Sequence, residues 1–297
     1  MSPNMQESPA DRLRYGIYAP NLGKASTPLT YARLARQAEV SGWDGFFIWD
    51  HILEWNLRVP IFDAFTVLAA VATSTKHIRI GTTVTPLPRL KPWIVAKQTA
   101  TLDHLSNGRM VLGVGLGGKE STDYARFGET PDNRILAEKL DESLIVITGL
   151  WSGKPFSFRG DHYQVGKTVF LPTPLQKPRI PIWVGGSWPH HGPFLRAAKW
   201  DGVIPLVAPG RLAKPAEISD IVAFIKRSRP DLSGFDVVEI NWTTGGNKAN
   251  NAAKVSQFAE AGITWWLESM YAVRDSPERM LRRIIRGPPK VPGTKVA

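Results

Sequence analysis

The sequence predicts an α/β protein built as a single (β/α)8 TIM barrel with a short inserted β-hairpin. Eight short apolar runs alternate with eight helix-length segments along the 297 residues, and no shift in composition marks a domain boundary. The apolar runs also lack the alternation of a strand with one wet face, which is typical of parallel strands covered by helices. This alternation within one chain favours a barrel over a doubly wound sheet.

The clearest strand–helix–strand unit spans residues 78–118. Its two apolar runs, Ile78–Val84 and Met110–Gly115, are rich in β-branched or large aliphatic residues and are expected to be strands. The segment Pro92–Leu105 is expected to be a helix, because proline stands at its start and Ser-Asn-Gly follows its end.

The elements before this unit follow from similar signals. The first strand is expected at 14–19 (RYGIYA), where Pro-Asn-Leu-Gly ends the apolar run. A helix is expected at 28–41, with apolar residues at helical spacing and a Ser-Gly stop. The fully apolar run 44–49 (DGFFIW) predicts the second strand, and after a loop a helix is expected at 61–74.

After this unit, residues 119–151 have a helical pattern that is strongest over 133–150. Residues 152–172 break the rhythm, and their Arg-Gly-Asp sequence between short β-like runs predicts the inserted hairpin. The fifth strand is expected at 180–184, and a helix at 193–199 follows it. The last elements alternate in the same way: strands at 202–206, 237–242 and 263–268, and helices at 212–229, 250–261 and 277–286.

The two ends of the chain are expected to lie outside the barrel. Residues 1–13 are polar and predict a disordered lead-in, and the Pro- and Gly-rich residues 287–297 predict an irregular tail. The barrel is therefore expected over 14–286, with the hairpin at 152–172 as an insertion rather than a domain.

Composition excludes several classes of protein. The chain has no cysteine, which excludes disulfides, a thiolate nucleophile and cysteine-ligated metal. Its net charge is +11, but the Lys and Arg residues are scattered, which favours a basic surface over nucleic-acid binding. A phosphate-bearing small ligand is left open as a partner for some of this charge.

The start of the chain and its longest apolar runs indicate where the protein is found. The first 14 residues, MSPNMQESPADRLR, lack the apolar core of a signal peptide. No run approaches the roughly 18 apolar residues of a membrane span. We therefore expect a cytoplasmic protein that does not bind a membrane.

Metal and hydrolase chemistry are not favoured either. His190 and His191 are adjacent, so they do not share a helix face, and no Asp, Glu or His at ligand spacing accompanies them. No metal site is expected. There is no G-x-S-x-G sequence, and Ser187 has no obvious base near it, so a hydrolase triad is not expected.

In a barrel, the residues that follow the strands share one mouth, and here they form a specific group. Two glycine-rich strand ends and a Thr cluster suggest close approach of backbone to a flat or phosphate-bearing ligand. The residues after the first five expected strands are Pro20 and Asn21; Asp50 and His51; Thr83, Val84 and Thr85; Gly115, Leu116, Gly117 and Gly118; and Gly185, Gly186 and Ser187.

Individual members of this group have distinct expected roles. His51 is the histidine at such a strand end, and it could supply or accept a proton near neutral pH. Trp49 and Trp55 also lie near strand ends and could line an apolar pocket. The alternatives stay open that Asp50 only caps a turn and that the run from Gly115 to Gly118 is only a tight turn.

At this point the chain resembles the bacterial luciferase-like superfamily of flavin-dependent oxidoreductases, over about residues 14–289. The motifs that carry the resemblance are AEVSGWDGFFIWDH (38–51), IRIGTTVTPLPRLKPWIVAKQTATLDHLSNGRMVLGVGLGG (78–118), RGDHYQV (159–165), PRIPIWVGGSWP (178–189) and AAKWDGVIP (197–205). The resemblance implies an eight-stranded barrel that holds FMN or a deazaflavin coenzyme (F420) at its C-terminal mouth, and it leaves the choice between them open.

The resemblance also implies roles for named residues. A non-prolyl cis peptide is implied at Thr83-Val84, beneath the cofactor ring, and Asp50 and Thr85 match positions that touch the flavin in deazaflavin-dependent relatives. The second group of implied cofactor contacts is formed by Leu116, Gly117, Gly185 and Gly186, which match positions holding the ribityl chain and phosphate.

His51 matches the proton-transfer histidine of deazaflavin-dependent sugar-phosphate dehydrogenases. Those enzymes carry a Glu directly after the Gly-x-Gly of the fourth strand, where this chain has Gly118. The second acid/base group is therefore missing, and sugar-phosphate activity is not expected.

The expected function is that of a flavin- or deazaflavin-dependent oxidoreductase or monooxygenase of the luciferase-like family. It would act on a small organic substrate by hydride transfer or oxygen activation. The alternatives are a non-catalytic flavin-binding protein on the same barrel and, with less support, a nucleic-acid-binding protein. We expect a homodimer, since relatives often pair through barrel helices, and leave open a separate flavin or deazaflavin reductase as a partner.

Overall fold

The structure is a computed structural model, and it describes residues 13–23, 26–53, 58–117, 122–129, 132–207, 211–243, 246–273 and 276–291. The expected lead-in, apart from Leu13, and residues 292–297 of the expected tail lie outside these ranges. Residues 287–291 form neither helix nor strand.

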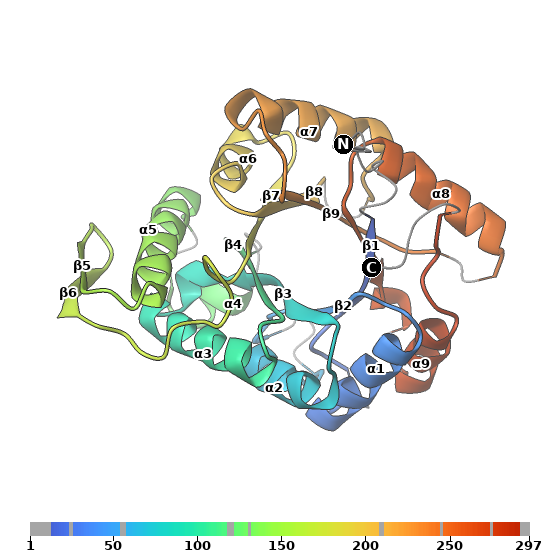
Figure 1. Cartoon of the computed structure of the whole chain (residues 1–297), viewed down its shortest axis with the longest axis horizontal. Coiled ribbons are helices and arrows are strands. Elements are labelled where there is room, and N and C mark those ends of the chain that lie inside the picture. The colour runs from blue at the N-terminus through green and yellow to red at the C-terminus, as the bar shows by residue number, and fades with distance from the viewer. Residues whose placement is uncertain are drawn as a thin grey trace, which may run out of the picture.

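Eight parallel strands close into a barrel, in the order β1-β10-β9-β8-β7-β4-β3-β2 (Figure 1). The TIM barrel predicted from the sequence is therefore confirmed. The barrel strands are β1 (Arg14–Ala19), β2 (Gly45–Ile48), β3 (Arg79–Pro86), β4 (Met110–Gly115), β7 (Ile182–Ser187), β8 (Gly202–Leu206), β9 (Asp236–Asn241) and β10 (Trp265–Ser269).

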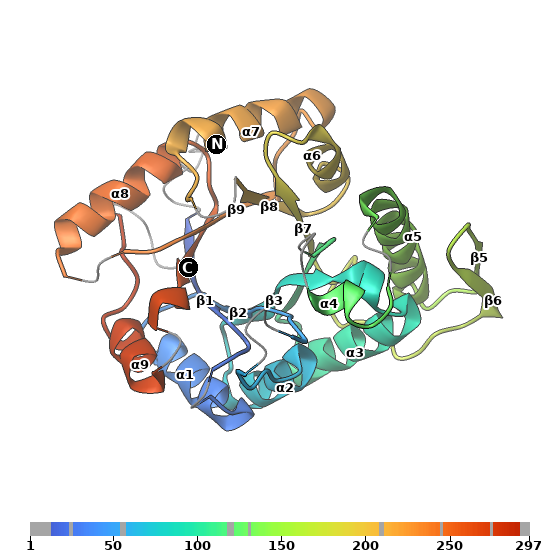
Figure 2. The ribbon, with the colours of Figure 1, turned by 180° about the vertical axis from the view of Figure 1, so that it is seen from behind.

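A ring of helices surrounds these strands (Figures 1 and 2). Its main members are α1 (Pro28–Val40), α2 (Ala64–Ser74), α3 (Pro92–Leu105), α5 (Asn133–Trp151), α6 (His191–Ala197), α7 (Pro215–Ser228), α8 (Lys248–Glu260) and α9 (Pro277–Ile285). In the described ranges, short helical segments also follow strands: η2 (Leu87–Arg89), α4 (Thr122–Ala125) and η3 (Tyr271–Val273).

Several helix boundaries differ by a few residues from those expected: α6 and α8 begin earlier, and α2 and α7 begin later. The helix expected from residue 61 begins at Ala64, because the Asp63 carboxylate accepts a hydrogen bond from the Thr66 amide (2.7 Å). The helical pattern over 119–151 is divided between α4 and α5 rather than continuous. Gly128 ends the first part with φ of 73°, and Asp132 caps the start of α5.

The predicted hairpin, β5 (Phe156–Arg159) and β6 (Gln164–Thr168), projects from the barrel beside α5 (Figure 1, left). Its turn is held by Glu142 of α5. The Glu142 carboxylate accepts hydrogen bonds from the backbone N–H groups of Asp161 (2.7 Å) and Tyr163 (2.9 Å). The Arg-Gly-Asp sequence thus forms a turn anchored to a helix.

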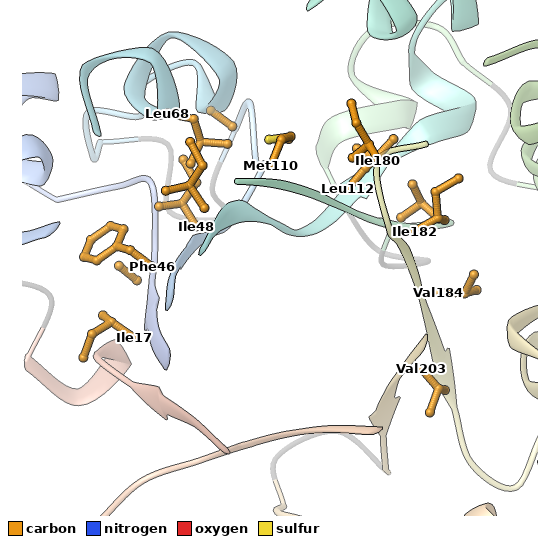
Figure 3. Packing of buried hydrophobic residues seen from close by; sticks show 14 of the residues in the cluster. Ile17, Phe46, Ile48, Leu68, Met110, Leu112, Ile180, Ile182, Val184 and Val203 are labelled. Carbon is orange, nitrogen blue, oxygen red and sulfur yellow. The ribbon is translucent and has the colours of Figure 1, made fainter. Parts of the chain in front are cut away.

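Two apolar layers follow from the alternation of side chains along each strand. The outer layer packs between strands and helices, and it includes Ile17, Phe46, Ile48, Leu112, Ile182, Val184 and Val203 (Figure 3). The inner layer fills the barrel with Phe47, Val111, Trp183, Ile204, Val238, Trp265 and Leu267.

Three aromatic rings dominate the inner layer. The ring centroid of Phe47 lies 5.0 Å from that of Trp183 and 5.5 Å from that of Trp265. A Cβ added at Gly45 would lie 2.5 Å from Phe47 Cε2, so the ring needs the space that this glycine leaves. Since Trp183 and Trp265 stand near the starts of their strands, these rings fill the lower barrel and leave the C-terminal mouth for a ligand.

No helix in the described ranges is long and apolar enough to cross a membrane.

Candidate functional site

Asp50, which follows β2, is fixed in a buried ion pair with Arg89 at the end of η2. The distance from Asp50 Oδ1 to Arg89 Nη2 is 2.5 Å, and only 6% and 7% of the two side chains are exposed. The Thr85 hydroxyl donates to Asp50 Oδ2 (2.8 Å). Burial raises the pKa of Asp50, while the Arg89 guanidinium and the Thr85 hydroxyl oppose that rise.

Strand β3 contains a bulge at the expected cis peptide. The Thr83-Val84 bond is cis, and this structural expectation is confirmed. Pairing with β4 runs from Thr82 with Leu112 to Thr85 with Val114, so β3 carries one extra residue there. Thr83 is buried, and its hydroxyl has no hydrogen-bond partner among the described residues.

The bulge places Val84 against a glycine of the adjacent strand β4 and a glycine of β7, the strand beyond it. A Cβ added at Gly115 of β4 would lie 2.8 Å from Val84 Cγ2, and one at Gly185 of β7 would lie 3.0 Å from Val84 Cγ1. These glycines therefore leave room for the Val84 side chain. The apolar side chain of Val84 thus lies at the mouth, over glycine positions of β4 and β7.

The remaining glycines of the predicted site have separate structural reasons. Gly117 has φ of 81°, a left-handed conformation that favours glycine, and an added Cβ would lie 3.1 Å from Pro86 Cβ. The Tyr124 hydroxyl donates to the Leu116 carbonyl (2.7 Å) and fixes this turn. Gly118 lies outside the described residues.

The side of Gly186 on which a side chain would stand faces α6 and not Val84. A Cβ there would lie 2.3 Å from Pro193 Cβ, so the glycine lets α6 pack closely on β7. The structure therefore separates the two glycines of β7: Gly185 meets Val84, and Gly186 meets a helix.

His51 belongs to a second group at the mouth, formed by aromatic rings. Its ring centroid lies 5.5 Å from that of Trp49, which also lies 5.5 Å from the rings of Tyr18 and Tyr271. The side-chain amide of Asn21 donates to the His51 carbonyl (2.8 Å) and holds the loop after β2. Burial raises the pKa of the Tyr18 hydroxyl. Trp55 lies outside the described residues.

Sequence reasoning missed two residues of the mouth. Arg89 could have been identified from the PLPR sequence, because it is a cation that closely follows the Thr cluster. Tyr271 could also have been identified, because it closely follows the last expected strand and residues after the strands share the mouth.

Of the two adjacent histidines after β7, His191 packs on aromatic rings and His190 is exposed. The ring of His191 stacks on Phe224 with centroids 4.5 Å apart, and it lies 5.8 Å from Trp188. Among the described residues, no group of three or more His, Asp or Glu side chains is placed to hold a metal ion.

The geometry of the mouth fits a flat cofactor ring. Val84 offers an apolar side chain next to the glycine positions 115 and 185, and the buried Thr83 hydroxyl has no hydrogen-bond partner in the part of the chain that the structure describes. Backbone N–H groups and glycine turns of this kind suit ring, ribityl and phosphate groups.

Comparison with known proteins gives a family match. The model of the luciferase-like monooxygenase family matches residues 14–240. An F420-dependent glucose-6-phosphate dehydrogenase of Nakamurella multipartita is 34% identical over 186 residues, covering 61% of this chain and 52% of the relative. The oxygenase component of a flavin-dependent trigonelline monooxygenase of Acinetobacter baylyi is 35% identical over 130 residues, covering 44% and 36%. The chain spans about half the length of the curated dehydrogenases it matches.

Solved structures support the fold. An F420-dependent secondary alcohol dehydrogenase in complex with an F420-acetone adduct superimposes with a TM-score of 0.79 at 19% identity, covering 94% of this chain and 99% of the other. The oxygenating constituent of 3,6-diketocamphane monooxygenase of Pseudomonas putida, in complex with FMN, gives 0.75 at 16% identity, covering 96% and 99%. At these sequence identities the structural similarity supports the fold and nothing beyond it.

Proposed function

The chain belongs to the luciferase-like monooxygenase family, and from this premise we propose that it is an oxidoreductase that uses FMN or coenzyme F420. Its substrate is a small organic molecule, changed by hydride transfer or by oxygen activation. Relatives of both kinds, F420-dependent and flavin-dependent, keep the two cofactors open.

One observation carries the proposal: the contact of Val84 with the glycine positions of β4 and β7. This contact leaves an apolar, side-chain-poor surface at the C-terminal mouth, where a flat tricyclic ring can lie. In the proposal Thr83, Val84 and Thr85 lie against the ring. The backbone at Leu116, Gly117, Gly185 and Gly186 holds the ribityl chain and phosphate.

Asp50 and His51 have different roles in this proposal. Asp50 fixes Thr85 and Arg89 beside the ring through its two carboxylate oxygens. His51 lies beside Trp49 at the mouth and moves the proton that the reaction requires. The bound cofactor supplies the redox chemistry, and the protein binds it, orients it and excludes water.

The partners and location are part of the same proposal. We propose that the protein forms a homodimer and acts in the cytoplasm. Where oxygen is the co-substrate, a separate reductase supplies reduced cofactor.

Cofactor titration tests the proposal directly. Purified ligand-free protein is titrated with FMN, with F420 and with riboflavin as a phosphate-free control, and cofactor fluorescence is followed. We expect one phosphorylated cofactor to bind at micromolar concentration and riboflavin to bind more weakly. Preference for F420 directs the substrate search to dehydrogenases and reductases, and preference for FMN directs it to monooxygenases. Binding of neither cofactor contradicts the proposal.

A further inference from the structure

Four aromatic residues form a wall on one side of the mouth, and we call them the aromatic wall: Tyr18, Trp49, His51 and Tyr271. Trp49 is its centre. Its ring is nearly parallel to that of Tyr271, with centroids 5.5 Å apart and planes 14° apart. It meets Tyr18 at 43° and His51 at 65°, again with centroids 5.5 Å apart.

The alternation of β2 directs the wall toward the barrel axis. Phe47 belongs to the inner layer and Ile48 to the outer layer, so Trp49 returns to the inner side. Tyr18 pairs in register with Phe47 and packs on the inner layer. The wall therefore continues the aromatic filling of the barrel up to its mouth.

Trp49 has an unused hydrogen-bonding group. Its indole Nε1 is buried, and no described residue accepts a hydrogen bond from it. Buried Trp N–H groups usually have a partner, so an acceptor atom on a ligand would complete this site. Tyr271 keeps 36% of its surface exposed, which leaves ring area accessible beside Trp49.

The wall and the proposed cofactor surface occupy neighbouring sectors of the mouth. Strands β10, β1 and β2, which carry the wall, are consecutive in the barrel order. Strands β3, β4 and β7, which carry Val84, Gly115 and Gly185, are also consecutive, and β3 pairs with β2. A ligand on the wall would thus stand beside a ring that lies over Val84.

We infer that the aromatic wall is the substrate subsite and that it takes a flat aromatic ring carrying a hydrogen-bond acceptor for Trp49 Nε1. The inference rests on the proposed function and names the substrate class for the same site. Stacked and edge-on rings favour planar, polarisable ligands. No member of the wall is Lys or Arg, so the wall lacks a permanently charged partner for a phosphate group.

Binding of matched probes tests the inference. Quinoline carries a ring acceptor, naphthalene has a similar shape without one, and glucose 6-phosphate is a charged, non-aromatic probe. Each is titrated by calorimetry into the ligand-free protein and into the protein loaded with whichever cofactor binds. We expect quinoline to bind about fivefold more tightly than naphthalene, which is what one added hydrogen bond contributes. We expect no binding of glucose 6-phosphate.

Two variants separate the roles of ring and N–H. Trp49→Phe keeps an aromatic ring and should abolish the preference for quinoline over naphthalene. Tyr271→Leu removes ring area and should weaken both probes about tenfold. Trp200→Phe is the matched control, because Trp200 lies just before β8, at the opposite end of the barrel from the wall. It should change neither affinity.

Three results would overturn the inference: binding of glucose 6-phosphate without quinoline, equal affinities for quinoline and naphthalene in the unaltered protein, or a preference for quinoline that survives Trp49→Phe. Failure of the proposed function is distinguishable, because it appears as loss of cofactor binding. The probe titrations of ligand-free protein do not depend on that result.

Discussion

Asp50 and Arg89 form a buried ion pair that joins the end of β2 to the turn after β3. Nη1 and Nη2 of Arg89 both lie 3.1 Å from the Asp50 carbonyl oxygen, so the guanidinium contacts main chain and side chain together. The carboxylate thus has protein partners on both oxygens. Its effect on a ligand at the mouth is exerted largely through the position of Thr85 and Arg89.

A double-mutant cycle on this pair tests its contribution to stability. Asp50→Asn leaves a buried guanidinium without its counter-charge, and we expect the free energy of unfolding to fall by about 3 kcal/mol. Arg89→Gln should have a similar cost, and the double variant should lose clearly less than the sum. Urea unfolding measures all four proteins. Additive losses would show that the two side chains do not stabilise each other.

The contact between Val84 and Gly115 predicts a loss of cofactor binding. Gly115→Ala places a methyl group 2.8 Å from Val84 Cγ2, so the valine must shift. We expect cofactor affinity to fall about tenfold, the effect of moderate overpacking. Adding Val84→Ala should restore part of it by making room. Gly166→Ala in the hairpin is the control, since nothing lies within 4 Å of its added Cβ. An unchanged affinity in Gly115→Ala would remove Val84 and Gly115 from the cofactor site.

The sequence predicted the barrel because each strand and helix carries its own local signal. The helix expected at Pro92–Leu105 and the strand expected at Met110–Gly115 have the predicted bounds. Position after a strand also predicted which residues share the mouth. Contacts between distant residues could not be predicted in this way. Trp49 meets Tyr271 only because β10 closes the barrel beside β1, and Val84 meets Gly185 only because β3 bulges.

The ambiguity of the glycines has a similar origin. A glycine in a sequence shows that a side chain is missing but not what uses the space. Gly115 and Gly185 leave room for Val84, Gly117 adopts a left-handed turn, and Gly186 admits Pro193. Only the structure separates these reasons.

His51 is expected to act in the reaction and not in cofactor binding. His51→Ala should lower kcat by about 10²–10⁴-fold, the usual contribution of a positioned proton donor or acceptor. The dissociation constant of the cofactor should change little. His77→Ala is the matched control, because His77 is exposed just before β3, at the opposite end of the barrel. Turnover equal to that of the unaltered protein would exclude a proton-transfer role for His51.

Glu239 of β9 predicts how stability changes with pH. Its side chain is 1% exposed, and its hydrogen-bond donor is the Asn241 amide (2.8 Å), which is itself held by Lys254 of α8. Burial raises the pKa of Glu239 to about 8, with a smaller contribution from Glu217 of α7, while Asn241 and Lys254 oppose the rise. The folded protein therefore keeps a proton on this carboxyl at pH values where the unfolded chain has lost it.

Because the folded state binds more protons between the ordinary Glu pKa and about pH 8, the contribution of Glu239 to stability falls as pH rises through that window. Glu239→Gln keeps an acceptor for Asn241 and cannot ionise. We expect it to match the unaltered protein at pH 5 and to be more stable at pH 8.5 by on the order of 1–3 kcal/mol. Urea unfolding at both pH values measures the difference, and Glu260→Gln on the exposed side of α8 is the control. A difference that is independent of pH would show that Glu239 is ionised in the folded protein throughout this range.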